Sequence, residues 1–199
     1  SYIEPYASST CEMVAEILQY ICDNVKIKPI EADTIYAGIV IDTNSFSNKA
    51  GARTFEAAAF IRRNGADIIR VRKLLRSDMT EYKAKAEAVR HAEVYRDCFA
   101  ISICPSAGLQ SPTIVGAQAA NELLNISGIK ASIVFTLYND EIYISARSID
   151  EVNVQLIMER LGGGGHMTIA GAQLKGMDIE EAIDLVKKTL DEMIQEGAI

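Results

Sequence analysis

Residues 131–147 read ASIVFTLYNDEIYISAR, two β-rich segments joined by Asn139-Asp140. Both segments, 131–138 and 141–147, are rich in β-branched and aromatic residues, and the two residues between them favour turns. Two strands separated by two turn-forming residues predict a β-hairpin. The C-terminal half of the chain is therefore predicted to contain a β-sheet.

Helical segments flank this hairpin. Upstream, 98–104 is strand-like, and Ser111 stands as a helix cap before Pro112, which begins a helix that ends near Asn125. Downstream, the spacing of apolar residues predicts helices over 151–161 and 179–195. This half is predicted to be a small α/β lobe.

The N-terminal half carries a different pattern. Ser9 and Glu12 have the spacing of a capping box, which predicts a helix over 10–26 that Pro29 ends. The run TIYAGIVI at 34–41 is short, apolar and β-rich, which predicts a strand buried on both faces of a parallel sheet. Helical patterning follows over 54–63 and 67–76.

The predicted fold class is therefore α/β, with a partial parallel-sheet lobe followed by a smaller α/β lobe. The first domain is expected over 1–76 and the second over 94–199. The charged segment 77–93 between them is expected to be a connecting helix with Thr80 as its cap.

Composition excludes several classes of protein. The 199 residues carry a net charge of −7, the wrong sign for long contacts with duplex nucleic acid. No apolar run approaches the roughly 20 residues of a membrane span. The four cysteines form no Cys-x-x-Cys pair, which is typical of reduced thiols. An anionic ligand must therefore be bound by a local cluster of residues.

Asp42 follows the predicted strand, at the position where open α/β sheets place ligand-binding groups. A carboxylate there suits Mg²⁺ or Mn²⁺, although one carboxylate cannot hold a metal alone. Capping of the following loop is the alternative role.

Arg147 ends the second hairpin segment, and its planar guanidinium suits bidentate binding of phosphate; a surface ion pair is the alternative. The glycines at 162–165 precede His166 and would let the main chain approach an anion closely. A flexible connector is the alternative for them. Six basic residues between Arg62 and Arg76 are typical of a helix face that pairs with acidic neighbours.

Five motifs, taken in order, resemble the DHH superfamily of phosphoesterases. They are Ala7-Ser8-Ser9-Thr10, Gly38-Ile39-Val40-Ile41-Asp42-Thr43, Ser145-Ala146-Arg147-Ser148, Asn153-Val154-Gln155 and Gly162-Gly163-Gly164-Gly165-His166. Residues 117–126 and 153–166 look most similar to the membrane-anchored cyclic di-AMP phosphodiesterases. The resemblance implies the C-terminal part of a DHH domain over 1–76 and a DHH-associated substrate-binding domain over 94–199.

The resemblance also implies an activity, the hydrolysis of cyclic di-AMP to the linear dinucleotide at a two-Mn²⁺ centre. Asp42 matches the last metal-ligating aspartate of the family, so the resemblance implies that it is a metal ligand and a catalytic residue. The implied substrate-binding residues are Arg147, Gly163, Gly164, Gly165 and His166, with Ser145 and Asn153 as weaker candidates.

One departure matters, because the chain contains no His-x-Asp and no Asp-His-His motif. We therefore expect it to be the C-terminal part of a longer enzyme, binding nucleotide but turning over little by itself because its metal centre is incomplete. The expected partner is a cyclic dinucleotide or short oligonucleotide, and a homodimer stays open. The expected location is the cytoplasmic domain of a membrane-anchored bacterial protein. The alternatives are an oligoribonuclease-type or pyrophosphatase-type member of the superfamily, and a non-catalytic nucleotide-binding or dimerisation module.

Overall fold

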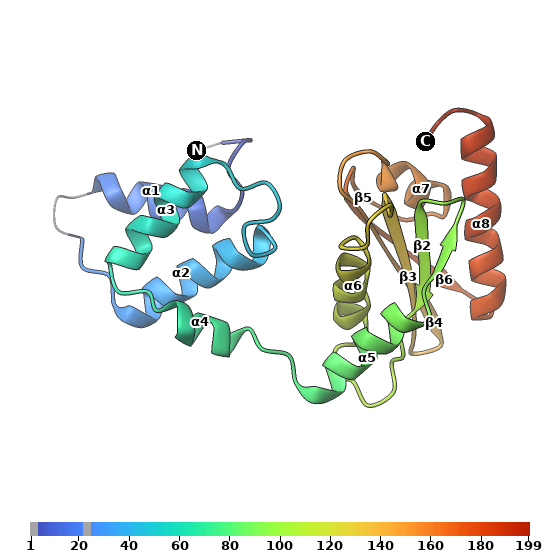
Figure 1. Ribbon diagram of the computed structural model, residues 1–199, viewed down its shortest axis with the longest axis horizontal. Coiled ribbons are helices and arrows are strands. Elements are labelled where there is room, and N and C mark those ends of the chain that lie inside the picture. The colour runs from blue at the N-terminus through green and yellow to red at the C-terminus, as the bar shows by residue number, and fades with distance from the viewer. Residues whose placement is uncertain (1–3, 22–24) are drawn as a thin grey trace. The chain divides into compact units, whose positions relative to one another are not determined.

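A computed structural model describes residues 4–21 and 25–199 (Figure 1). The chain divides into two compact units, Ser1–Arg76 and Ser77–Ile199. The helices and the mixed sheet confirm the predicted α/β class. None of the helices within the described ranges is long and apolar enough to cross a lipid bilayer.

The first unit is helical over the residues that the structure describes. Its helices are α1 (Thr10–Ile21), α2 (Pro29–Asp42), α3 (Ala52–Arg63) and α4 (Ile68–Leu74). The helices predicted over 54–63 and 67–76 are confirmed, as is the start of the first helix. Its predicted continuation at 22–24 lies outside the described residues, and residues 25 and 26, which the prediction included, are not helical. The predicted strand over 34–41 is wrong, since this run lies within α2, and no parallel sheet forms among the described residues of this unit.

Local and tertiary contacts explain why this apolar run is helical. Pro29 occupies the first turn of α2, where its missing N–H costs nothing, and so begins a helix where the sequence predicted that one ends. The Glu31 carboxylate accepts a hydrogen bond from the Lys28 N–H at 2.9 Å and caps the same turn. A Cβ on Gly38 would lie 2.2 Å from Cys11 Sγ, so this glycine lets α1 and α2 pack closely. Burial against α1 therefore decides between helix and strand.

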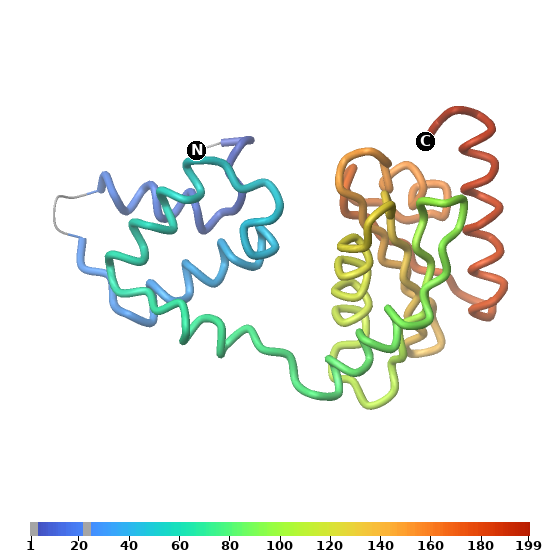
Figure 2. The backbone as a smooth tube through the Cα atoms, in the orientation of Figure 1, coloured from blue at the N-terminus to red at the C-terminus, as the bar shows by residue number. Residues whose placement is uncertain are grey.

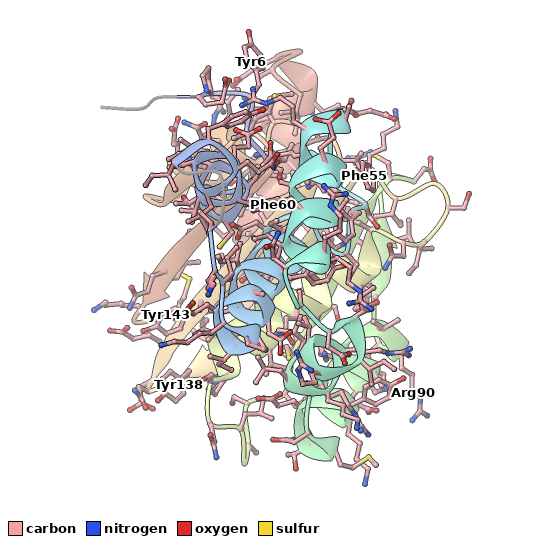
Figure 3. All side chains as sticks on the ribbon, turned by 90° about the vertical axis from the view of Figure 1, so that its left-hand side faces the viewer. Tyr6, Phe55, Phe60, Arg90, Tyr138 and Tyr143 are labelled. Atoms are coloured by element: carbon pink, nitrogen blue, oxygen red, sulfur yellow. The ribbon has the colours of Figure 1, made fainter. Side chains whose placement is uncertain are left out.

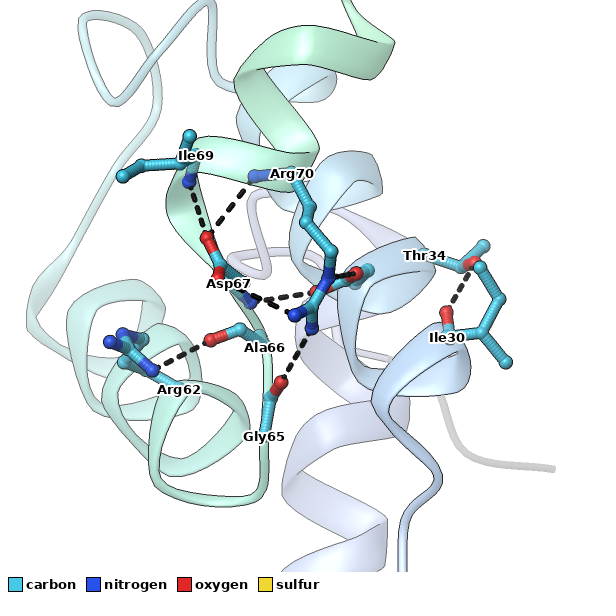
Figure 4. A network of polar contacts seen from close by, with 9 residues as sticks. Ile30, Thr34, Arg62, Gly65, Ala66, Asp67, Ile69 and Arg70 are labelled. Carbon is cyan, nitrogen blue, oxygen red and sulfur yellow. Dashed lines mark hydrogen bonds and ion pairs between the residues drawn. The ribbon is translucent and has the colours of Figure 1, made fainter.

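Buried polar groups join the helices of this unit. Glu12 on α1 is 1% exposed, and its carboxylate accepts hydrogen bonds from the Ser8 N–H at 3.1 Å, from the Ser8 hydroxyl and from the Thr54 hydroxyl at 2.7 Å. Arg70 on α4 donates to Asp33 on α2 at 2.6 Å and to the Gly65 carbonyl at 3.1 Å (Figure 4). This pairing agrees with the expected role of the basic run.

The Glu12 contacts predict a large loss of stability on truncation. Glu12→Ala would leave the Ser8 and Thr54 hydroxyls without their acceptor in a buried site, so we expect the free energy of unfolding to fall by about 2–4 kcal/mol. Chemical unfolding followed by circular dichroism measures this change. Glu56→Ala, which removes an exposed carboxylate from α3, is the matched control and should change stability little. Equal stability of the two variants would contradict the structural role of Glu12.

The second unit is built on a six-stranded sheet in the order β1-β2-β3-β4-β6-β5. Its strands are β1 (Glu93–Tyr95), β2 (Phe99–Ile103), β3 (Ala131–Tyr138), β4 (Glu141–Ser148), β5 (Gly164–His166) and β6 (Ile169–Lys175). Its helices are α5 (Met79–Arg90), α6 (Pro112–Leu123), α7 (Val154–Arg160) and α8 (Ile179–Gln195). Only β2 and β3 pair in parallel; the other four pairs are antiparallel.

Helices lie on both faces of this sheet, as Figure 1 shows for α6 and α8. Alternate residues of β3 point to opposite sides, so that Val134 packs with α5 and α6, whereas Ile133 packs with α7 and α8. A Cβ on Gly116 would lie 2.2 Å from Thr136 Oγ1, and this glycine therefore lets α6 lie close against β3.

The predicted hairpin is confirmed. Asn139 and Asp140 have φ values of 53° and 60°, the left-handed pair that a two-residue turn of this type requires (the turn can be followed in Figure 2). The strand over 98–104 and the helices that begin at Pro112 and Ile179 are also confirmed. Thr80 is not the cap of α5, because the Asp78 carboxylate accepts the hydrogen bonds of the first turn, from the N–H groups of Thr80 and Glu81.

Candidate functional site

The sheet brings the hairpin and the glycine run together. Within β4, buried residues alternate with half-buried ones, among them Tyr143, Ser145 and Arg147 on one face. Arg147 pairs with Ile169 of β6, which pairs with His166 of β5. Directly paired residues point to the same face, so Arg147 and His166 share a row, with their strands about 10 Å apart.

Arg147 is held with part of its guanidinium unused. Its Nη1 donates to the Ala146 carbonyl at 2.8 Å and to the Ala170 carbonyl at 3.4 Å. Its Nε is buried without a hydrogen-bond partner, and Nη2 contacts no acceptor in the part of the chain that the structure describes. Burial lowers the pKa of this guanidinium. The Nε–Nη2 edge thus carries two donors in the geometry that suits an anion, and Nε itself is covered by protein atoms in this conformation.

The glycines that precede His166 differ in what the fold requires of them. Gly162 has a φ of 77° and ends α7, because its N–H donates to the Glu159 carbonyl while the Gly163 N–H donates to the Met158 carbonyl. This is a Schellman cap, so the first glycine has a structural role. The flexible-connector alternative does not hold for this residue.

The other three glycines lie against β6 or beside open space. A Cβ on Gly163 would lie 2.2 Å from the Gly171 carbonyl oxygen, and one on Gly165 would lie 2.4 Å from the Ile169 carbonyl oxygen. A Cβ on Gly164 would meet nothing within 4 Å. Gly163 and Gly165 are therefore needed for the contact with β6, whereas the fold itself does not require Gly164 to be glycine.

The remaining predicted residues have separate environments. Ser145 pairs with Gly171, which pairs with Gly164, so a second row of small residues lies beside the row of Arg147. His166 is exposed on the edge strand β5. Asn153 instead caps α7, because its side-chain oxygen accepts from the Gln155 N–H at 3.1 Å and the Leu156 N–H at 3.4 Å.

An open groove of about 530 Å³ follows this face of the sheet. Its lining includes Ser145, Gly163 and Gly171, together with four residues that the sequence analysis missed: Thr113, Tyr143, Gln173 and Lys175. Gln173 and Lys175 lie on β6, which the sequence analysis did not predict. The period-two pattern of Ala170, Ala172 and Leu174 would have indicated this strand.

Asp42 lies in the first unit, as the exposed last residue of α2. Burial raises the pKa of the Cys11 thiol, and the nearby negative charge of Asp42 raises it further. Across residues 4–21 and 25–199, no three His, Cys, Asp or Glu side chains are grouped so as to hold a metal ion. The donor set around Asp42 therefore does not fit a metal centre by itself.

Comparisons with known proteins show which family the second unit belongs to. Residues 106–196 match the DHHA1 domain family. The chain is 43% identical over 198 residues to the "Cyclic-di-AMP phosphodiesterase GdpP" of Bacillus subtilis, covering 98% of this chain and 30% of the relative. It is 44% identical over 182 residues to the "Cyclic-di-AMP phosphodiesterase PdeA" of Listeria monocytogenes, covering 91% of this chain and 28% of the relative. The chain thus spans less than a third of these proteins.

A solved structure shows the same fold. The exopolyphosphatase-related protein from Bacteroides fragilis aligns with a TM-score of 0.84 at 21% identity, covering 96% of this chain and 58% of that one. The predicted family resemblance is confirmed. Residues 106–196 belong to the DHHA1 domain family, and nearly the whole chain is similar to a region of the cyclic di-AMP phosphodiesterases GdpP and PdeA.

Proposed function

We propose that the second unit binds cyclic di-AMP along the groove beside β4, β5 and β6, as part of a phosphodiesterase that opens the ring to the linear dinucleotide. The relatives similar to this chain are named for this activity. The groove volume of about 530 Å³ lies within the range of small-molecule sites.

The observation that carries the proposal is the unpartnered Nε of Arg147. A buried N–H donor without an acceptor is costly, and a charged one more so. A rotation of the Arg147 side chain that uncovers the Nε–Nη2 edge would let a phosphate oxygen supply the missing acceptor and a counter-charge. His166, in the same row, would add a second donor to the phosphate from across β6.

The chemistry itself would need a centre that these residues do not complete. Asp42 is proposed to contribute one carboxylate to a Mn²⁺ centre, whose further ligands are not grouped among the residues that the structure describes. A carboxylate is a suitable ligand for that ion. Nucleotide binding is therefore the part of the proposal that this chain can test alone.

We expect the 199-residue chain to bind cyclic di-AMP without added metal. Arg147→Ala and His166→Ala should each weaken this binding by about 1–3 kcal/mol, the value of a hydrogen bond to a charged group. Isothermal titration with cyclic di-AMP and with linear diadenylate measures the change. Arg90→Ala, which removes an exposed arginine on α5, is the matched control (Figure 3).

The outcomes separate the alternatives. Binding of the linear dinucleotide alone would favour an oligoribonuclease-type activity over a cyclic substrate. Affinity that stays unchanged in both variants would remove Arg147 and His166 from the site. A folded wild-type chain that binds neither ligand would contradict the proposal.

A further inference from the structure

One end of the groove carries a cluster of polar side chains joined by hydrogen bonds and an ion pair. Tyr143 and Gln173 are paired residues on β4 and β6, and both line the groove. The Tyr143 hydroxyl donates to the Glu141 carboxylate at 3.2 Å. The Gln173 amide nitrogen donates to the same carboxylate, and to the Tyr143 oxygen at 3.2 Å. Lys175 forms an ion pair with Glu141.

These contacts determine the orientation of the Gln173 amide. An ionised carboxylate can only accept hydrogen bonds, so the NH₂ group must face Glu141. The ion pair with Lys175 is the main cause that lowers the pKa of Glu141, and the hydrogen bonds from Gln173 and Tyr143 lower it further. Together they outweigh the opposing effect of burial, so Glu141 is ionised at neutral pH. The side-chain oxygen of Gln173 then remains as the acceptor, and it receives no hydrogen bond from any residue that the structure describes.

The rest of the groove leaves this end open to a ligand. Ser145 and Gly171, paired beside the Tyr143–Gln173 pair, are small and expose the sheet backbone. The Tyr143 ring is held at its hydroxyl and flanked by Tyr138, with ring centroids 6.3 Å apart (both are labelled in Figure 3). Arg147 and His166 do not line the groove itself, but the register of β4 and β6 places the row of Arg147 next to the Ser145–Gly171 pair, which is followed by the Tyr143–Gln173 pair. This face of the sheet therefore carries two donors, then small residues, then an aromatic ring beside an amide acceptor. That order of groups matches a phosphate followed by a nucleobase.

We propose that Gln173 makes this groove selective for a nucleobase whose edge carries an amino donor, as adenine does, and that Glu141 acts as a positioning residue by holding the amide in that orientation. The inference rests on the proposed function and extends it to the base. A base with a carbonyl at the same position would place two acceptors face to face. Turning the amide around would relieve this contact but would break its hydrogen bonds to Glu141 and Tyr143.

The test compares cyclic di-AMP with cyclic di-IMP, which carries a carbonyl in place of each 6-amino group. We expect the wild-type chain to bind cyclic di-AMP more tightly, with a ratio on the order of tenfold. Gln173→Ala should bring the ratio close to one. Glu141→Gln should also bring the ratio close to one, because a glutamine at 141 can pair with the Gln173 amide in either orientation. Most of the affinity for cyclic di-AMP should be retained in this variant. Gln195→Ala on α8 removes the same side chain outside the groove and should keep the wild-type ratio.

Melting curves of each variant establish that it is folded before the ratio is compared. A wild-type ratio near one, or a tenfold ratio that persists in Gln173→Ala, would overturn the assignment of the base end. If Arg147→Ala lost both ligands equally while Gln173→Ala kept the ratio, the proposed function would stand and this inference would fail. If the wild-type chain bound neither ligand, both would fail together.

Discussion

Gly163→Ala is expected to lower the free energy of unfolding by about 3 kcal/mol, whereas Gly164→Val should leave the fold intact. The alanine Cβ at 163 would lie 2.2 Å from the Gly171 carbonyl oxygen and 2.7 Å from Ala172 Cα, and backbone atoms within a sheet cannot move aside cheaply. At 164 no atom lies within 4 Å, and the backbone is outside the left-handed region. A β-branched residue in this strand should even add about 0.5–1 kcal/mol of stability.

The same pair of variants separates a structural role of the glycines from binding. Gly164 pairs with Gly171 on the face that carries Ser145, so a valine side chain there would stand beside the groove. We expect Gly164→Val to lose cyclic di-AMP binding by a hundredfold or so, about 3 kcal/mol, through steric exclusion of the phosphate. Melting curves and titrations of both variants supply the readouts. Wild-type affinity in Gly164→Val would show that no ligand approaches the backbone at this point.

Asp42→Asn is expected to abolish phosphodiesterase activity without destabilising the first unit. A negative charge at the C-terminal end of α2 is unfavourable beside the free carbonyl groups there, so removing it should raise the stability by about 0.3–1 kcal/mol. An exposed carboxylate in an unfavourable position is consistent with a role in function, because no packing or hydrogen bond of the described residues depends on it. Loss of a metal-ligating carboxylate would in turn remove the charge that binds the ion.

Phosphodiesterase activity is measured on a protein as long as the curated relatives, with cyclic di-AMP and Mn²⁺. The change in stability is measured on the 199-residue chain. Asp184→Asn, an exposed aspartate on α8, is the matched control and should leave both activity and stability close to wild type. Full turnover by a folded Asp42→Asn enzyme would refute the metal-ligand role. A marked loss of stability would instead assign Asp42 to the fold.

The elements that the sequence predicted correctly are those with local determinants. The hairpin follows from Asn139-Asp140, whose left-handed backbone suits a two-residue turn, and the helix at Pro112 follows from a proline in its first turn. The last helix combines an Asp178 cap with one apolar face. The family resemblance also depended on local residues, since the glycine-histidine motif is contiguous in the chain.

Tertiary contacts decided the rest. TIYAGIVI is apolar throughout, so its period cannot distinguish a buried strand from a buried helix, and the close contact of Gly38 with Cys11 was needed to settle the question. The individual roles of the four glycines depend on which backbone atoms of β6 lie opposite them. The binding face requires β4, β6 and β5 side by side, which places Arg147 and His166 in one row on either side of Ile169 and pairs Tyr143 with Gln173. The sequence alone thus determined the local turns, the caps and the family, because these depend on neighbouring residues, whereas the binding face was decided by strand pairing between residues far apart in the chain.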